Sequence, residues 1–209
     1  MKLADLHSHT SLCNHATGQP GEYLRAAARA GLSHLGVSDH CPWPDWLDPR
    51  WHMDAKEFPE YSRIVSDLQK MSGLYGVGGL YGLEMDYVEG LMHEVWPKLQ
   101  NEPFDYLIGS VHYVDGFPMD SPDSMHLWHE HGGPDRIWLR YAELLLDFVR
   151  QGGFNIIGHC DLTKKFAFYP SDMAPFRRKM REVFEAAAAN GIAVELNTAG
   201  LRKPVREIY

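Results

Sequence analysis

The sequence predicts an α/β protein whose strands run parallel to one another. Short apolar runs alternate with longer amphipathic runs along all 209 residues, a pattern typical of strands joined by right-handed helical crossovers. The short runs are almost entirely apolar, as in sheets that are covered on both faces. Polar residues of ligand type follow several of them. We therefore expect a single domain over residues 1–209 with a core of parallel strands.

Each expected element rests on a local signal. The first helix has Pro20 and Glu22 in its opening turn, where both residue types are favoured, and Gly31 just after its end. The second keeps apolar residues at helical spacing despite Pro59, and the last ends at Gly191. The expected helices cover residues 20–30, 55–71, 90–101, 134–151 and 172–190. The expected strands cover residues 1–6, 34–38, 77–83, 106–111, 155–158 and 192–196.

Two longer segments lie outside these elements. Residues 41–54 are rich in proline and tryptophan, which indicates an ordered loop over the mouth of a site. Residues 113–133 form a long insertion whose histidines we expect to be solvated or to face a ligand. The tryptophans of both segments either line a pocket or pack loops onto the core, and packing is favoured. They are Trp43, Trp46, Trp51 and Trp128.

Composition excludes several classes of function. Apolar residues make up 44% of the chain and charged residues 23%, which is ordinary for a globular protein. A net charge of -8 argues against a general surface for nucleic acid or for an anionic membrane. No run has the length of a membrane span or the pattern of a secretory signal, and the three cysteines make no disulfide framework. We expect a reduced, cytoplasmic protein, and its oligomeric state stays open.

Residue types that bind metals follow the ends of five expected strands. They are His7 and His9, Asp39 and His40, Glu84, His112, and His159. In a parallel barrel all of these strand ends lie on one face, where active sites are found. A single buried histidine more often packs in a core than binds a metal. Five strands in succession that end this way favour a metal site.

The ligand types narrow the choice of metal and of chemistry. Imidazole and carboxylate without a thiolate cluster favour zinc, manganese or iron over calcium or magnesium. Glu84 is the natural bridge, because one carboxylate can give an oxygen to each of two metals. Paired metals can activate a hydroxide and stabilise an anionic oxygen. The sequence therefore predicts hydrolysis, with a phosphate ester as the expected substrate.

The same strand ends carry a resemblance that runs almost from end to end. The motifs are Asp5-Leu6-His7-Ser8-His9-Thr10, Ser38-Asp39-His40, Gly82-Leu83-Glu84, Gly109-Ser110-Val111-His112, Gly158-His159-Cys160-Asp161 and Glu195-Leu196-Asn197-Thr198-Ala199-Gly200-Leu201-Arg202. In this order they resemble the polymerase-and-histidinol-phosphatase (PHP) superfamily, and most of all its histidinol-phosphate phosphatases. The resemblance implies a distorted (β/α)7 TIM-like barrel with two to three metal ions. It also implies hydrolysis of L-histidinol phosphate to L-histidinol and phosphate in histidine biosynthesis.

The resemblance also implies a ligand set, position by position. His7, His9 and Glu84 correspond to ligands of a first metal. Glu84, His112 and His159 correspond to those of a second, and His15 with His40 to those of a third. The ions would be zinc, manganese or iron.

The remaining roles follow from the same resemblance. A hydroxide that bridges two metals would attack phosphorus in line, with Glu84 as the central carboxylate. Asp39 would orient a ligand or a water molecule. Lys165 and Arg202 would contact the phosphate, the alternative for each being a solvated surface charge.

One departure from the family pattern stands out. The family continues to a seventh strand with an Asp-x-His motif that completes the first and third metal sites. No such motif follows the sixth expected strand here. We expect a C-terminally truncated barrel without its last strand and helix, with weaker metal loading at those two sites.

Two other functions stay open on the sequence alone. A nuclease-like phosphodiesterase of the same superfamily would need a cationic groove for a nucleic-acid strand. The net charge of -8 and the lack of lysine or arginine runs argue against such a groove. The second alternative is a catalytically impaired metal-binding domain, and the missing Asp-x-His motif favours it.

Overall fold

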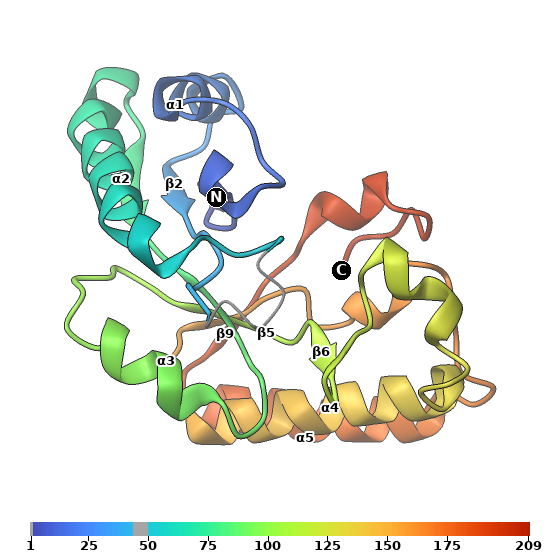
Figure 1. Cartoon of the computed structure of the whole chain (residues 1–209). Helices are drawn as coiled ribbons and strands as arrows, with labels where there is room; N and C mark the ends of the chain where they lie inside the picture. Colours follow the sequence, from blue (N-terminus) through green and yellow to red (C-terminus); the bar gives the residue numbers. More distant parts are fainter. Residues whose placement is uncertain (1, 44–49) are drawn as a thin grey trace. The chain divides into compact units, whose positions relative to one another are not determined.

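The computed structural model describes residues 2–43 and 50–209. They divide into two compact units, the first comprising Met1–Met85 and His93–Ile108 and the second Asp86–Met92 and Gly109–Tyr209. Strands alternate with helices in both units, as predicted (Figure 1). Residues 44–49 of the loop expected over 41–54, with Trp46, lie outside the described residues. No described helix is long and apolar enough to cross a membrane.

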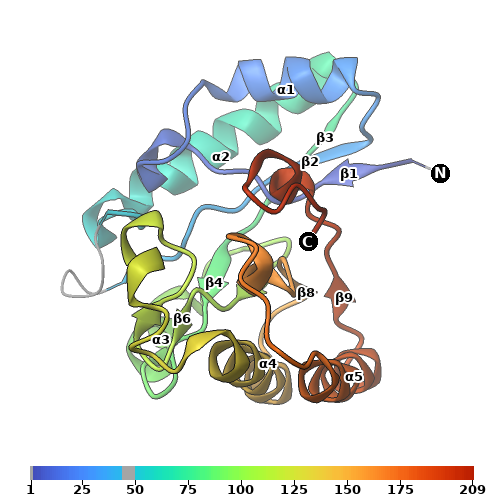
Figure 2. The ribbon, with the colours of Figure 1, turned by 90° about the vertical axis from the view of Figure 1, so that its right-hand side faces the viewer.

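The first unit contains a parallel sheet in the order β1-β2-β3. Its strands are β1 (Ala4–Asp5), β2 (His34–Val37) and β3 (Gly78–Tyr81). Its helices are α1 (Pro20–Arg29), α2 (Phe58–Ser72) and most of α3 (Met92–Leu99). α1 and α2 lie side by side along this sheet (Figures 1 and 2).

Pro20 and Pro59 do not interrupt their helices, because both lie in the first turn. Gln19 and Glu22 form a reciprocal capping box around the start of α1, with Pro20 in its first turn. Asp54 and Glu57 do the same for a 3-10 turn that leads into α2. Pro59 falls within the first turn of α2, where its missing N–H costs no helical hydrogen bond.

Tyr106 ties the strands of the first unit together. Its hydroxyl donates a hydrogen bond to the carbonyl of Leu6 at 2.5 Å. The ring occupies space that is open only because residues 36 and 82 are glycines, since a Cβ at either position would collide with it. These two glycines are therefore needed to make room for the Tyr106 ring.

Replacing Gly36 with alanine should lower the free energy of unfolding by about 2 kcal/mol, because the new methyl group displaces the Tyr106 ring. Gly73→Ala is the matched control. Its φ is -60° and no heavy atom lies within 4 Å of the added Cβ, so it should be neutral or slightly stabilising. Urea unfolding of both variants checks this, and equal stabilities would contradict it.

The second unit holds most of a four-stranded sheet and the two longest described helices. Its strands are β8 (Ile156–Ile157), β9 (Ala193–Val194) and the parts of β4 (Glu84–Asp86) and β5 (Ile108–Ser110) that fall in this unit. The strand order of the sheet is β4-β5-β8-β9. α4 (Gly133–Gln151) and α5 (Ala174–Ala189) pack side by side (Figure 2). α4 supplies much of the core through Trp138, Tyr141 and Leu145.

The structure adds one feature and corrects one expectation. The insertion over 113–133, for which no helix or strand was predicted, has secondary structure of its own. It contains a hairpin of β6 (Tyr113–Val114) and β7 (Phe117–Pro118), followed by a 3-10 helix over Pro122–Leu127. Asp115 and Gly116 both have positive φ at its turn, an Asp-Gly signal that was readable in the sequence. The first and last strands are also shorter than predicted and exposed instead of covered on both faces, since each lies at a sheet edge.

Candidate metal centre

In the first unit, three imidazoles approach one oxygen of a buried carboxylate. The distances to Glu84 Oε2 are 3.1 Å from His7 Nε2, 3.4 Å from His9 Nε2 and 3.2 Å from His40 Nδ1. The Glu84 side chain is 1% exposed. A carboxylate at this depth needs positive charge nearby to offset its lost hydration. The arrangement is that of donor atoms gathered around a cation.

Backbone pairing explains why Glu84 lies there. It forms an isolated parallel bridge with His40. The Glu84 N–H donates to the Asp39 carbonyl at 2.9 Å, and its own carbonyl accepts from the Cys41 N–H at 2.8 Å. α2 contributes through Tyr61, whose hydroxyl donates to the Gly82 carbonyl at 2.6 Å and lies 3.3 Å from the Asp39 nitrogen. Both strand ends are thus held by hydrogen bonds before any metal binds.

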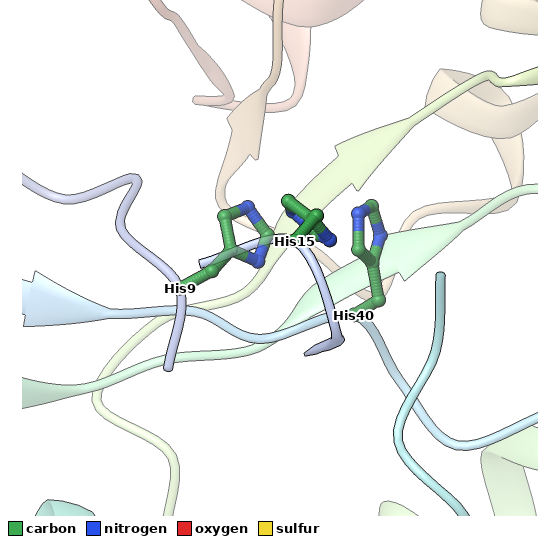
Figure 3. A group of neighbouring side chains, drawn as sticks. All are labelled: His9, His15 and His40. Carbon is green, nitrogen blue, oxygen red and sulfur yellow. The ribbon is translucent and has the colours of Figure 1, made fainter. Parts of the chain in front are cut away.

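His15 joins His9 and His40 in a second cluster, drawn in Figure 3. The ring centroid of His9 lies 4.8 Å from that of His15 and 4.8 Å from that of His40. One ligand atom from each of the three lies within 4.8 Å of the others. His15 Nδ1 lies 2.7 Å from the carbonyl of Cys13, to which it can donate, and this leaves Nε2 as a lone-pair donor.

The electrostatics suit metal binding. Burial, helped by the neighbouring His40, lowers the pKa of His9 well below its ordinary value, although Glu84 acts in the opposite direction. A neutral imidazole is the form that binds metals. His9 Nδ1 is buried and has no hydrogen-bond partner among the described residues. The donor set of imidazoles and one carboxylate fits zinc, manganese or iron.

The metal-free chain should lose stability below about pH 6.5, the ordinary pKa of histidine. Since the folded-state pKa of His9 is depressed, the unfolded chain binds more protons there. Its contribution is present above the unfolded pKa and is lost as the pH falls through the folded one. Urea unfolding in chelator at about pH 7.5 and pH 5.5 checks this. His9→Gln should show a weaker pH dependence, and an equal one would refute the explanation.

Asp39 lies beside this cluster and is completely buried. Its two oxygens accept hydrogen bonds from the backbone N–H and the hydroxyl of Thr10, both at 2.5 Å. Burial raises its pKa, against the hydrogen bonds from Thr10. Asp39 therefore fixes the backbone next to His9.

In the second unit, His112 and His159 lie together at the ends of β5 and β8. Their ring centroids are 5.0 Å apart in an edge-to-face arrangement. His159 is anchored by its N–H, which donates to Glu195 Oε2 at 2.8 Å, and by its carbonyl, which accepts from the Tyr141 hydroxyl at 2.9 Å. His112 Nδ1 hydrogen-bonds to the carboxylate of Asp86, which is 0% exposed.

Sequence reasoning missed Asp86, although a signal was present. Alternate residues of a strand point to the same side, so the spacing from Glu84 already placed two acids on one side of β4. The Asp86 carboxylate fixes which nitrogen of His112 carries the proton and leaves Nε2 for a metal.

Asp86→Asn should weaken zinc binding by about 10- to 100-fold, since an amide holds the imidazole less firmly and does not raise its basicity. Competition with a chromogenic chelator measures the affinity. Asp67→Asn, at an acid that is 43% exposed, is the control and should leave the affinity unchanged. An Asp86→Asn affinity equal to that of the native chain would contradict the assignment.

The two predicted phosphate contacts have different surroundings. Lys165 Nζ lies 2.9 Å from Asp120 Oδ2, and its side chain is only 15% exposed. Arg202 ends the 3-10 helix Thr198–Arg202 and is exposed.

The cysteines and the described tryptophans mostly pack. Cys13 is buried, and its sulfur accepts a hydrogen bond from the His40 N–H at 3.1 Å. Trp43 and Trp128 are buried, whereas the ring of Trp51 lies 5.9 Å from that of His15.

Comparison with known proteins agrees with this geometry. A model of the PHP domain matches residues 5–199. A Deinococcus radiodurans protein named "Probable histidinol-phosphatase" is 40% identical over 99% of this chain and 77% of its own length. The crystal structure of a Listeria monocytogenes protein has a TM-score of 0.88 at 22% identity, over 99% of this chain and 86% of that one.

A second solved structure is histidinol phosphate phosphatase from Lactococcus lactis, in complex with zinc, L-histidinol and phosphate. It has a TM-score of 0.79 at 22% identity and covers 98% of this chain and 76% of that one. These likenesses show the α/β fold of the PHP phosphatases, which is the distorted barrel that the motifs implied. On the domain match and the 40% identity over almost its whole length, the chain belongs to the PHP family.

Proposed function

We propose that this chain hydrolyses L-histidinol phosphate to L-histidinol and phosphate. The observation that carries the proposal is the approach of three imidazoles to one buried oxygen of Glu84. The Deinococcus relative and the Lactococcus neighbour support the choice of substrate. The reaction would use two to three zinc, manganese or iron ions. When bound, these ions supply an activated water and positive charge for the phosphoryl oxygens.

The ligand assignment follows the two clusters. His7, His9 and Glu84 would hold one ion, and His15 with His40 another. His112 and His159 would contribute to a further one. Among these groups, only Glu84 supplies negative charge, so it offsets the cations most directly.

The other polar residues would position these groups and the substrate. Asp39 keeps Thr10 in place and so orients His9. Lys165 would bind the phosphate as a point charge and Arg202 as a planar fork with parallel donors. In-line attack on phosphorus needs its oxygens neutralised, which these cations support.

The test compares phosphate release from L-histidinol phosphate with hydrolysis of bis(p-nitrophenyl) phosphate, each with and without added zinc or manganese. We expect the monoester to be cleaved only with metal and the diester to be cleaved slowly. Preferred cleavage of the diester would point to a phosphodiesterase. Metal binding without cleavage of either compound would indicate a domain that only binds metal.

A further inference from the structure

Asp120 is held rigidly on the segment that follows the β6-β7 hairpin. Its neighbours in sequence, Met119 and Ser121, are 0% and 6% exposed. The Met119 N–H donates to the His112 carbonyl at 3.2 Å, and its carbonyl accepts from the Trp128 indole at 3.1 Å. The Ser121 N–H donates to the Pro118 carbonyl at 3.2 Å. The carboxylate of Asp120 therefore projects from a fixed backbone.

Among the described residues, one of its two oxygens, Oδ2, takes part in a hydrogen bond. Oδ2 accepts from Lys165 Nζ at 2.9 Å, and the two side chains are 21% and 15% exposed. No hydrogen bond reaches Oδ1 from the described residues. A carboxylate has lone pairs for about four hydrogen bonds, so Asp120 retains capacity for a further cationic donor.

The charges around Asp120 are unusual for a phosphate site. Burial acts to raise the pKa of Asp120, but nearby positive charge, chiefly the Lys165 ammonium group 2.9 Å from Oδ2, lowers it below its ordinary value. Lys203 lies within electrostatic range of Lys165, Asp120 and Arg202. The three cations Lys165, Arg202 and Lys203 suit a phosphate dianion. An ionised carboxylate among them, however, repels that dianion. The carboxylate favours binding only of a phosphate that brings its own positive charge.

L-histidinol phosphate meets this condition, because its ammonium group is on the carbon next to the ester carbon. We propose that Asp120 determines specificity by accepting the substrate ammonium group through Oδ1 while Oδ2 holds Lys165 toward the phosphate. This inference rests on the proposed function and deepens it. It names the residue that distinguishes a phosphorylated amino alcohol from a plain phosphomonoester.

Two substrates that differ only in the amine test the proposal. They are L-histidinol phosphate and 3-(imidazol-4-yl)propyl phosphate. The metal-loaded native chain should prefer the first in kcat/KM, and Asp120→Asn should reduce that preference by about 10- to 100-fold, the value of one hydrogen bond between charged groups. Asp120→Glu, which keeps the charge, should retain part of the preference. Asp123→Asn, a nearby acid, should retain all of it.

Each other outcome overturns one claim. If Asp120 only positioned Lys165, both substrates would lose equally and the preference would persist, which refutes the inference. A native chain that cleaves both at the same rate also refutes it, while the phosphatase proposal stands. A native chain that cleaves neither refutes the proposed function. Calorimetric binding of L-histidinol then still decides the inference, because equal affinity of the native chain and Asp120→Asn would overturn it. Thermal unfolding establishes that each variant is folded.

Discussion

Replacing Glu84 with glutamine should lower kcat for L-histidinol phosphate by about a thousandfold or more, equivalent to about 4 kcal/mol of lost transition-state stabilisation. Glutamine keeps the shape of the side chain but removes the negative charge that His7, His9 and His40 surround. Metal ions held mainly by neutral imidazoles bind less tightly. Metal content measured on the same sample should fall together with kcat.

A loss of fold is excluded by measuring the chain without metal. Burying a carboxylate costs free energy, so the metal-free Glu84→Gln variant should unfold at a temperature no lower than the metal-free native chain. Glu60→Gln is the matched control, because Glu60 is 46% exposed on α2 and should not affect turnover. Native kcat and native metal content in Glu84→Gln would contradict the role given to this residue.

Removing the metals should abolish turnover and lower the melting temperature by about 10 °C. A ligand present at a thousand times its Kd stabilises the folded state by about 4 kcal/mol. For a chain of this size that corresponds to a shift of about 8–16 °C. Calorimetry before and after treatment with a chelator measures the shift, and added zinc or manganese should restore both properties.

The same experiment on Glu84→Gln separates specific binding from general effects of the chelator. The variant should show a much smaller shift, since it lacks the charge that retains the ions. Turnover that survives complete removal of metal would rule out the proposed chemistry. An equal shift in both proteins would locate the stabilising metal away from Glu84.

The helices could be predicted because their signals are local. α1 and α4 begin and end within a residue or two of the expected positions, since proline, glycine and acidic residues act within one turn. The first and last residues of the strands were harder to predict. β1 and β9 are only two residues long, because a strand ends where its partner ends and that partner is not a neighbour in sequence.

The candidate site could likewise be predicted only in part. The order of ligand-type residues at strand ends predicted that His7, His9 and His40 would gather with Glu84, and in the first unit they do. The family resemblance paired His15 with His40, and the structure brings both together with His9. Apart from Asp86, the supporting groups had no signal of this kind in the sequence. That Thr10 binds Asp39, or that Lys165 pairs with Asp120, depends on side-chain positions that no periodicity encodes.

The most direct measurement is anomalous diffraction at the zinc edge from crystals of the zinc-loaded chain. We predict a zinc peak at about 2.0–2.2 Å from a Glu84 carboxylate oxygen, with His7 and His9 nitrogens completing its surroundings. Zinc found only at other residues, with Glu84 bound to none, would contradict the account.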